Sequence, residues 1–127
     1  MPAYNFRRHF TELIVRGVKC CTIRPPRARR PTRPGDVLHL FTGMRTRSCI
    51  KLRQATCLDV QPITIAENVI VLAGRTLNAD ERAALIQADG FASSADFYTF
   101  FRNQYGLPAE LELITWNEPL KDTSLET

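Results

Sequence analysis

The segment 17–24, with the sequence GVKCCTIR, contains three side chains whose types could do chemistry. They are the ammonium of Lys19, the hydroxyl of Thr22 and the guanidinium of Arg24. Small and β-branched residues at 20–23 predict a short strand, so Lys19 stands at the start of that strand. A lysine in this position either stays in water or is drawn into a cleft, and only the second arrangement gives it a chemical role.

The pleat of the predicted strand decides which of these side chains can meet. Thr22 and Arg24 share one face because successive side chains alternate. Lys19 is three residues from Thr22, so in a regular strand it would point to the other face. The two meet only if Lys19 lies in the turn before the strand, or if a bulge shifts the alternation.

A proline-rich basic segment follows directly at 25–34. Four prolines in ten residues forbid a helix and a central strand, so we predict an extended loop. Each guanidinium in it can hold a phosphate with two parallel hydrogen bonds, which makes the loop a candidate for binding nucleic acid. The alternative is a solvated basic loop without a partner. Together with the residue that ends the preceding strand, the candidate arginines are Arg24, Arg27, Arg29, Arg30 and Arg33.

The net charge of +4 hides a strong asymmetry along the chain. Residues 1–58 contain thirteen Lys or Arg against two acids, a net charge of +11, whereas residues 59–127 contain four against eleven, a net charge of −7. Such a division is typical of a surface that binds a polyanion, and RNA or DNA is the expected partner. The alternative is that the two oppositely charged halves fold against each other and cancel.

The composition excludes several classes of protein and site. No apolar run approaches the ~18 residues of a membrane span, and the first residues lack the pattern of a signal peptide. His9 and His39 lie far apart with no carboxylate motif near either, so we expect neither a metal nor a cofactor. Reduced thiols in a cytoplasm are expected because the four cysteines form neither a disulfide framework nor a zinc spacing. These cysteines are Cys20, Cys21, Cys49 and Cys57.

Hydrophobic periodicity and turn residues predict the order of the elements. A helix of about ten residues ends at Gly17, and two further helices begin at Asn78 and at Ser93 or Ser94. The predicted strands cover 4–6, 20–23, 37–41, 48–60, 63–65, 69–72 and 111–116. The predicted fold class is α+β: a small, mostly antiparallel sheet that curls or closes into a barrel, with two to three flanking helices. One domain is expected over 1–117, followed by a polar tail at 118–127.

This order of elements and three short motifs resemble the ASCH domain family, which belongs to the PUA-like β-barrels. The motifs are GVKCCTIR at 17–24, PGDVL at 34–38 and ADGF at 88–91, and the resemblance spans about residues 4–117. It implies a barrel with a cleft that accepts RNA or modified nucleosides. Some small bacterial members are amidohydrolases that remove the acyl group from N4-acetylcytidine with a Lys, a Thr and an acidic residue, and other members bind or cut RNA.

The resemblance places the catalytic roles on Lys19, Thr22 and Asp89, although Asp89 stands where the amidohydrolases carry the longer Glu. Thr22 would attack the acyl carbon, Lys19 would remove its proton, and Asp89 would position Lys19 or the substrate amine. An ordinary lysine has a pKa of ~10.4, so a lysine base needs surroundings that favour its neutral form. Burial and Arg24 act in that direction, whereas Asp89 acts against it.

The rival interpretation is a binding module without catalysis, in which Lys19 and Arg45 join the loop arginines in contacting RNA. RNA cleavage is a third interpretation, and the absence of a suitably placed histidine weakens it. Phe91, Tyr105 and Trp116 either stack on a base or pack in the core. The expected partner is therefore RNA or a modified nucleoside, bound by a monomer.

Overall fold

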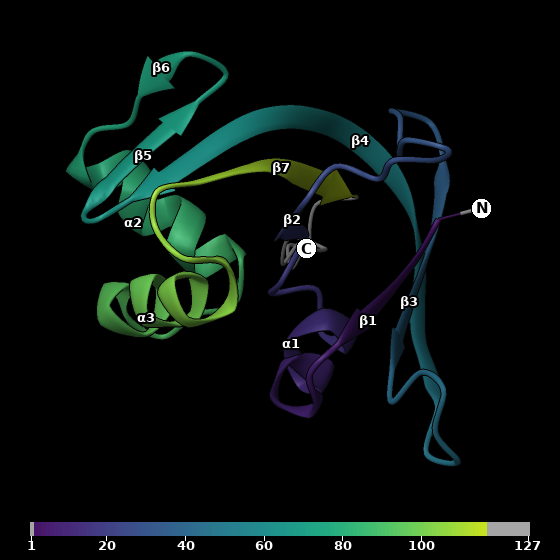
Figure 1. The fold of residues 1–127 in the computed structure, drawn as a ribbon. Helices are drawn as coiled ribbons and strands as arrows, with labels where there is room; N and C mark the ends of the chain where they lie inside the picture. The colour runs from purple at the N-terminus through teal and green to yellow at the C-terminus, as the bar shows by residue number, and fades with distance from the viewer. Residues whose placement is uncertain (1, 117–127) are drawn as a thin grey trace, which may run out of the picture.

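A computed structural model describes residues 2–116 of the 127-residue chain and has an α+β fold built on one curled, seven-stranded sheet (Figure 1). The predicted fold class is therefore confirmed. The sheet remains open, so of the two predicted forms it is the curled sheet and not the closed barrel. The predicted polar tail at 118–127 lies outside the described residues.

Every predicted helix has a counterpart in the structure, and so has every predicted strand, although the strands predicted at 48–60 and 63–65 form one strand. The helices are α1 (Thr11–Val15), preceded by the 3-10 turn η1 (Arg8–Phe10), then α2 (Ala79–Ala88) and α3 (Ser94–Tyr105). The strands are β1 (Ala3–Phe6), β2 (Cys21–Arg24), β3 (Val37–Thr42), β4 (Ile50–Ala66), β5 (Val69–Leu72), β6 (Arg75–Thr76) and β7 (Ala109–Trp116). The two-residue β6 was not predicted.

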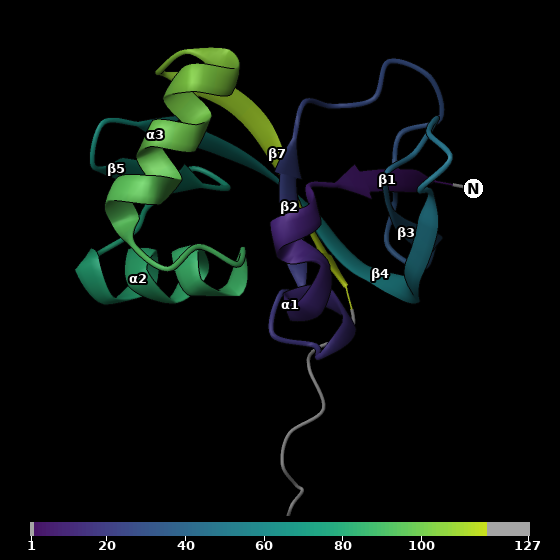
Figure 2. The ribbon, with the colours of Figure 1, turned by 90° about the horizontal axis from the view of Figure 1, so that it is seen from below.

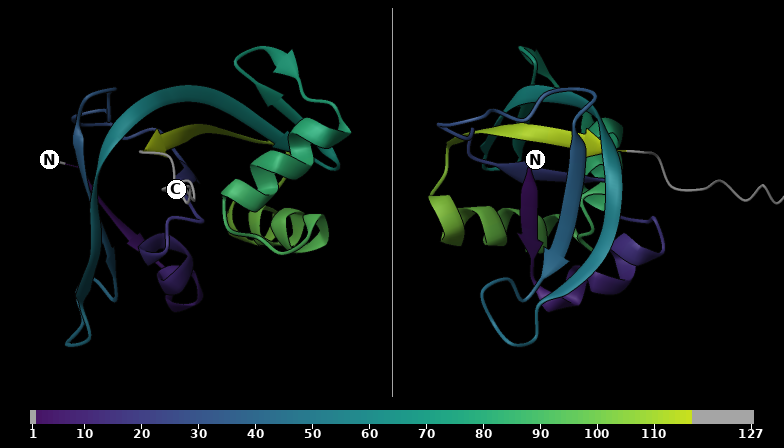
Figure 3. Two further views of the ribbon diagram at one scale, coloured as in Figure 1. Left: turned by 180° about the vertical axis from the view of Figure 1, so that it is seen from behind. Right: turned by 90° about the vertical axis from the view of Figure 1, so that its right-hand side faces the viewer.

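The long strand β4 connects the two halves of the sheet, and it arches over the molecule in Figures 1 and 3. Its first part pairs with β3, and its second part pairs with β7 and β5. The prediction of two separate strands here was wrong because Pro62 does not interrupt the pairing. The Pro62 carbonyl accepts a hydrogen bond from Ala73 N at 2.9 Å. The proline nitrogen therefore faces the end of β5, where a ladder N–H is not required.

Two hydrophobic clusters fill the two halves. The first lies under α2 and α3 and includes Phe97, Phe101 and Ile65. The second lies between α1 and strands β1, β3 and β4, and includes Phe6 and Trp116. Figure 2 shows α2 and α3 on one side and β1 and β3 on the other, with β2 and α1 between them. Phe91, in the connection from α2 to α3, packs against both clusters.

The sheet is open between β1 and β2, and we call this opening the seam. β1 pairs in parallel with β3 only, and β2 pairs with β7 only. A side chain bridges the two edges instead of a backbone ladder: Arg24 Nη2 donates to the backbone carbonyl of Asn5 at 2.6 Å. The seam therefore leaves room for other side chains between the two halves.

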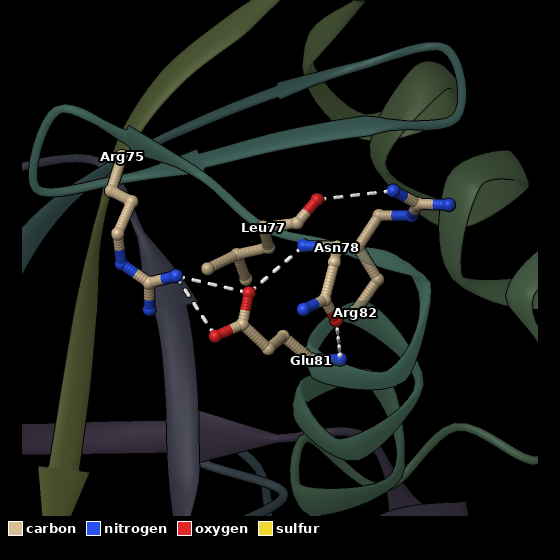
Figure 4. A network of polar contacts seen from close by, with 5 residues as sticks. All are labelled: Arg75, Leu77, Asn78, Glu81 and Arg82. Carbon is tan, nitrogen blue, oxygen red and sulfur yellow. Dashed lines mark hydrogen bonds and ion pairs between the residues drawn. The ribbon is translucent and has the colours of Figure 1, made fainter.

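The start of α2 is fixed by a reciprocal cap, shown in Figure 4. The Asn78 side chain accepts from Glu81 N at 2.9 Å, and Glu81 Oε1 accepts from Asn78 N at 2.9 Å. Arg75 Nη1 donates to both Glu81 carboxylate oxygens, and Arg82 Nη1 donates to the Leu77 carbonyl at 3.1 Å. The capping box predicted from the sequence is confirmed.

Replacing Asn78 by Ala should lower the free energy of unfolding by about 1 kcal/mol, because the Glu81 N–H loses its acceptor. Urea denaturation measures the change. Asn78→Asp keeps a side-chain oxygen that can accept the hydrogen bond from Glu81 N, and it serves as the control. Equal stability of the Ala variant and the unmodified protein would show that the cap contributes nothing.

Candidate active site

A cavity of about 190 Å³ lies at the seam. Pockets for drug-sized ligands have about 300–1,000 Å³, so this one accepts a group of the size of a single base. Strands β1 and β2, η1, α3 and the connection from α2 to α3 all contribute to its wall. Its polar lining residues are Asn5, Arg7, Lys19, Thr22, Arg24, Asp89, Gln104 and Tyr105.

A buried ion pair forms one wall of the cavity. Lys19 Nζ donates to Asp89 Oδ1 at 2.6 Å and to the Asp89 backbone carbonyl at 2.5 Å. Both residues are only 2% exposed. The ammonium also lies 4.6 Å from the centroid of the Phe10 ring and 5.6 Å from that of Phe6, which is cation–π distance. Lys19 is thus drawn into a cleft, and the interpretation of a solvated lysine was wrong.

Lys19 lies in the turn before β2. This turn, and not a bulge in the strand, allows Lys19 and Thr22 to line the same cavity. Val18 N and Lys19 N both donate to the Leu13 carbonyl, at 2.8 and 3.0 Å, so the turn is tied to the end of α1. Cys20 N donates to the Ala88 carbonyl at 3.2 Å and attaches the same turn to the end of α2. The turn therefore places the lysine beside Asp89, which follows α2.

Gly90 makes room for the ion pair. It has a φ of +92°, a conformation that other residues rarely adopt. A Cβ built on it would lie 3.1 Å from Lys19 Cδ and 3.1 Å from the Phe10 ring. Both the backbone conformation and the close approach of Lys19 therefore require glycine here.

Burial raises the pKa of the Asp89 carboxyl, while the charges of Lys19 and Arg24 lower it, and burial has the larger effect. Burial likewise raises the pKa of the Cys21 thiol well above its usual range. Cys21 therefore stays a thiol and is unsuited to be a nucleophile.

The Thr22 hydroxyl lies on the cavity wall opposite the hydrophobic face of β2. Thr22 is 4% exposed, and its Oγ1 accepts a hydrogen bond from Arg24 Nε at 3.1 Å. The Arg24 guanidinium lies 4.9 Å from the centroid of the Phe6 ring and 5.3 Å from that of Tyr4. Lys19, Thr22 and Asp89, the three predicted catalytic residues, thus line one cavity together with Arg24.

The aromatic candidates differ in position. Phe91 lines the cavity, but its ring contacts those of Phe10 and Phe97 edge-on at 5.5 and 5.4 Å. Tyr105 lines the cavity and is 36% exposed. Trp116 is 1% exposed, packs edge-on against Phe6 in the core and does not line the cavity. Trp116 therefore cannot stack on a base in this cavity, and that prediction was wrong.

The other predicted arginines lie outside the cavity and are exposed: Arg27, Arg29, Arg30, Arg33 and Arg45. Arg27 and Arg30 line a second cavity of about 510 Å³ together with Asp36. Within residues 2–116, Lys19–Asp89 is the only ion pair that joins the basic and the acidic half of the chain. The exposed loop arginines are therefore not neutralised by ion pairs with the acidic half in this part of the chain.

Sequence reasoning missed Asn5, Arg7 and Gln104 in the cavity wall. Arg7 Nη2 donates to Gln104 Oε1 at 3.2 Å, and the Arg7 guanidinium lies 5.1 Å from the centroid of the Phe100 ring. The two partners are 97 residues apart and belong to no shared motif. Only the packing of α3 against the end of β1 reveals them.

The Lys19→Met variant tests the buried pair. It removes the charge that lowers the pKa of Asp89 and leaves the burial that raises it. Breaking a buried pair on one side typically costs about 3–5 kcal/mol at neutral pH. A raised folded-state pKa stabilises the protein below the ordinary carboxyl value, and this contribution is lost as the pH rises through the raised pKa.

The loss of stability in Lys19→Met should therefore grow from pH ~4 to pH ~7, as measured by urea denaturation across that range. The double variant Lys19→Met/Asp89→Asn has no carboxyl at this position. Its loss of stability should therefore not grow between pH ~4 and pH ~7. If the loss of stability in Lys19→Met does not depend on pH, the conclusion that burial raises the pKa of Asp89 is wrong.

Within residues 2–116, no helix is long and apolar enough to cross a membrane, and no group of three or more His, Cys, Asp or Glu side chains is arranged to hold a metal ion. Comparisons of the chain with protein-family models, with curated proteins and with solved structures give no match.

Proposed function

We propose that this protein is an ASCH-like amidohydrolase that removes the acyl group from N4-acylcytidine, with Lys19, Thr22 and Asp89 as its catalytic residues. The observation that carries the proposal is the convergence of these three residues on one base-sized cavity, although Lys19 and Asp89 are 70 residues apart. The cavity also fits the substrate in composition, because aromatic rings and a few hydrogen-bonding groups recognise an unstacked base.

In the first step, the Thr22 oxygen attacks the carbonyl carbon of the acyl group and transfers its proton to the neutral amine of Lys19. The hydrogen bond from Arg24 Nε orients Thr22 Oγ1, and the positive charge of Arg24 in the same cavity favours the negative charge that develops on the acyl carbonyl oxygen. The tetrahedral intermediate then collapses with cleavage of the C–N4 bond. The Lys19 ammonium returns the proton to N4, so cytidine leaves and an acyl ester remains on Thr22.

In the second step, water attacks the acyl ester while Lys19 accepts the proton of the water. Collapse of the second tetrahedral intermediate releases a carboxylic acid, and Lys19 returns the proton to Thr22. One amide and one water thus become one amine and one acid, and the site is restored without a metal or an oxidant.

The first step requires Lys19 as a neutral amine, and Asp89 fixes the position of that amine. Lys19 Nζ lies 2.6 Å from Asp89 Oδ1 and 2.5 Å from the Asp89 backbone carbonyl oxygen. Burial raises the pKa of the Asp89 carboxyl, while the charge of Lys19 lowers it, and burial has the larger effect. Asp89 is therefore the residue that positions the base.

The purified protein should convert N4-acetylcytidine into cytidine and acetate, and chromatography measures this conversion. Lys19→Ala and Thr22→Val should each lower kcat/KM by about 10³-fold or more, since each removes a member of a unit that acts together. Thr22→Ser keeps the hydroxyl and should retain measurable turnover. If the unmodified protein cleaves none of a set of N-acylated nucleosides, the proposal fails.

A non-catalytic RNA-binding module is the second candidate, and the exposed loop arginines favour it. With single-stranded RNA, each phosphate contact contributes a salt slope of about 0.7. Affinity should therefore fall steeply from low to moderate salt. The slope should shrink by about 2 in the variant Arg27→Ser/Arg29→Ser/Arg30→Ser. Anisotropy of a labelled oligonucleotide measures both quantities, and a flat salt response or an unchanged slope would argue against this candidate.

A further inference from the structure

Arg24, which lines the cavity, and Arg27, which lies outside it, both contact the ring of Tyr4. The guanidinium carbons of Arg24 and Arg27 each lie 5.3 Å from the centroid of the Tyr4 ring. Tyr4 is 5% exposed, and its hydroxyl is hydrogen-bonded to Thr32 Oγ1 at 2.5 Å, so the ring is fixed and ties the basic loop to β1. Both guanidiniums thus contact one fixed aromatic ring.

Neither the Arg24 nor the Arg27 guanidinium is paired with a carboxylate in the described part of the chain, and the nearby Asp89 is already paired with Lys19. Arg24 uses Nε and Nη2 for Thr22 and Asn5, while no hydrogen bond in the described part of the chain engages its Nη1. Two guanidiniums with unused donors favour an anion between them, because a bound anion removes their mutual repulsion.

We propose that Arg24 and Arg27 bind a phosphate group of the substrate, so that the substrate is a nucleotide, free or within an RNA strand, rather than a nucleoside. This inference rests on the proposed function for the position of the base. In that function the base occupies the cavity that Arg24 lines, while Arg27 lies outside this cavity and contacts the same Tyr4 ring as Arg24. A phosphate on the ribose would then lie at the side of the cavity where these two guanidiniums are found.

Positive charge continues beyond this site. Arg27 also lines the second cavity of about 510 Å³, where Arg30 contributes a further guanidinium. Arg30 has a φ of +50°, a conformation that is uncommon for a residue with a side chain. A strand longer than one nucleotide would therefore meet additional arginine past the first phosphate.

Calorimetric titration with cytidine, its 3′- and 5′-monophosphates and the dinucleotide CpC tests the inference independently of turnover. At least one phosphorylated ligand should bind about tenfold more tightly than cytidine at low salt. The ligand that gains most identifies the ester: a monophosphate indicates a free nucleotide, and CpC indicates a phosphodiester of a strand. Arg27→Gln should remove most of this gain.

Arg47→Gln is the matched control, because it removes the same charge from another exposed residue of the basic half that contacts neither Tyr4 nor either cavity. It should keep most of the gain. Equal affinity for all four ligands, no binding of any phosphorylated ligand, or an equal loss in both variants overturns the inference. A phosphate-dependent gain in affinity without hydrolysis would support the phosphate site and refute the amidohydrolase. Hydrolysis without such a gain would support the amidohydrolase and refute the phosphate site.

Discussion

The ion pair between Lys19 and Asp89 is the interaction on which the arrangement of the seam depends. It joins the turn before β2 to the end of α2, and both charges are almost fully removed from water. Removing two charges from water costs several kcal/mol for each ion, so such a pair is weak evidence for stability. Its position on a cavity wall, beside a hydroxyl and a second cation, favours a role in chemistry.

Local signals in the sequence predicted most of the elements correctly. The cap of α2 at Asn78 and that of α3 at Ser93 involve residues only three positions apart, so they are readable without tertiary structure. The continuity of β4 was not readable, because Pro62 is compatible with a strand only at the place where its partner β5 ends. The open seam could not be predicted either, because it depends on the pairing of β1 with β3 and of β2 with β7, which no local signal in the sequence indicates.

The candidate site was predictable in its chemistry and less so in its walls. Lys19 and Thr22 lie within one eight-residue motif, and a family resemblance supplied Asp89. Both faces of β7 are buried in hydrophobic clusters, since Leu113 belongs to one cluster and Trp116 to the other, and no residue of β7 lines the cavity. The sequence left open whether Trp116 stacks on a base or packs in the core, and only the tertiary structure decides for the core.

The strand β4 has a consequence for how the chain can vary in length. It supplies Ala55 and Cys57 to one hydrophobic cluster and Ile63 and Ile65 to the other, and a register shift between Cys57 and Asp59 separates the two pairs. Inserting or deleting a single residue between these pairs would turn every later side chain of the strand to the opposite face. The number of residues between the two halves of this strand is therefore fixed by the two clusters that it serves.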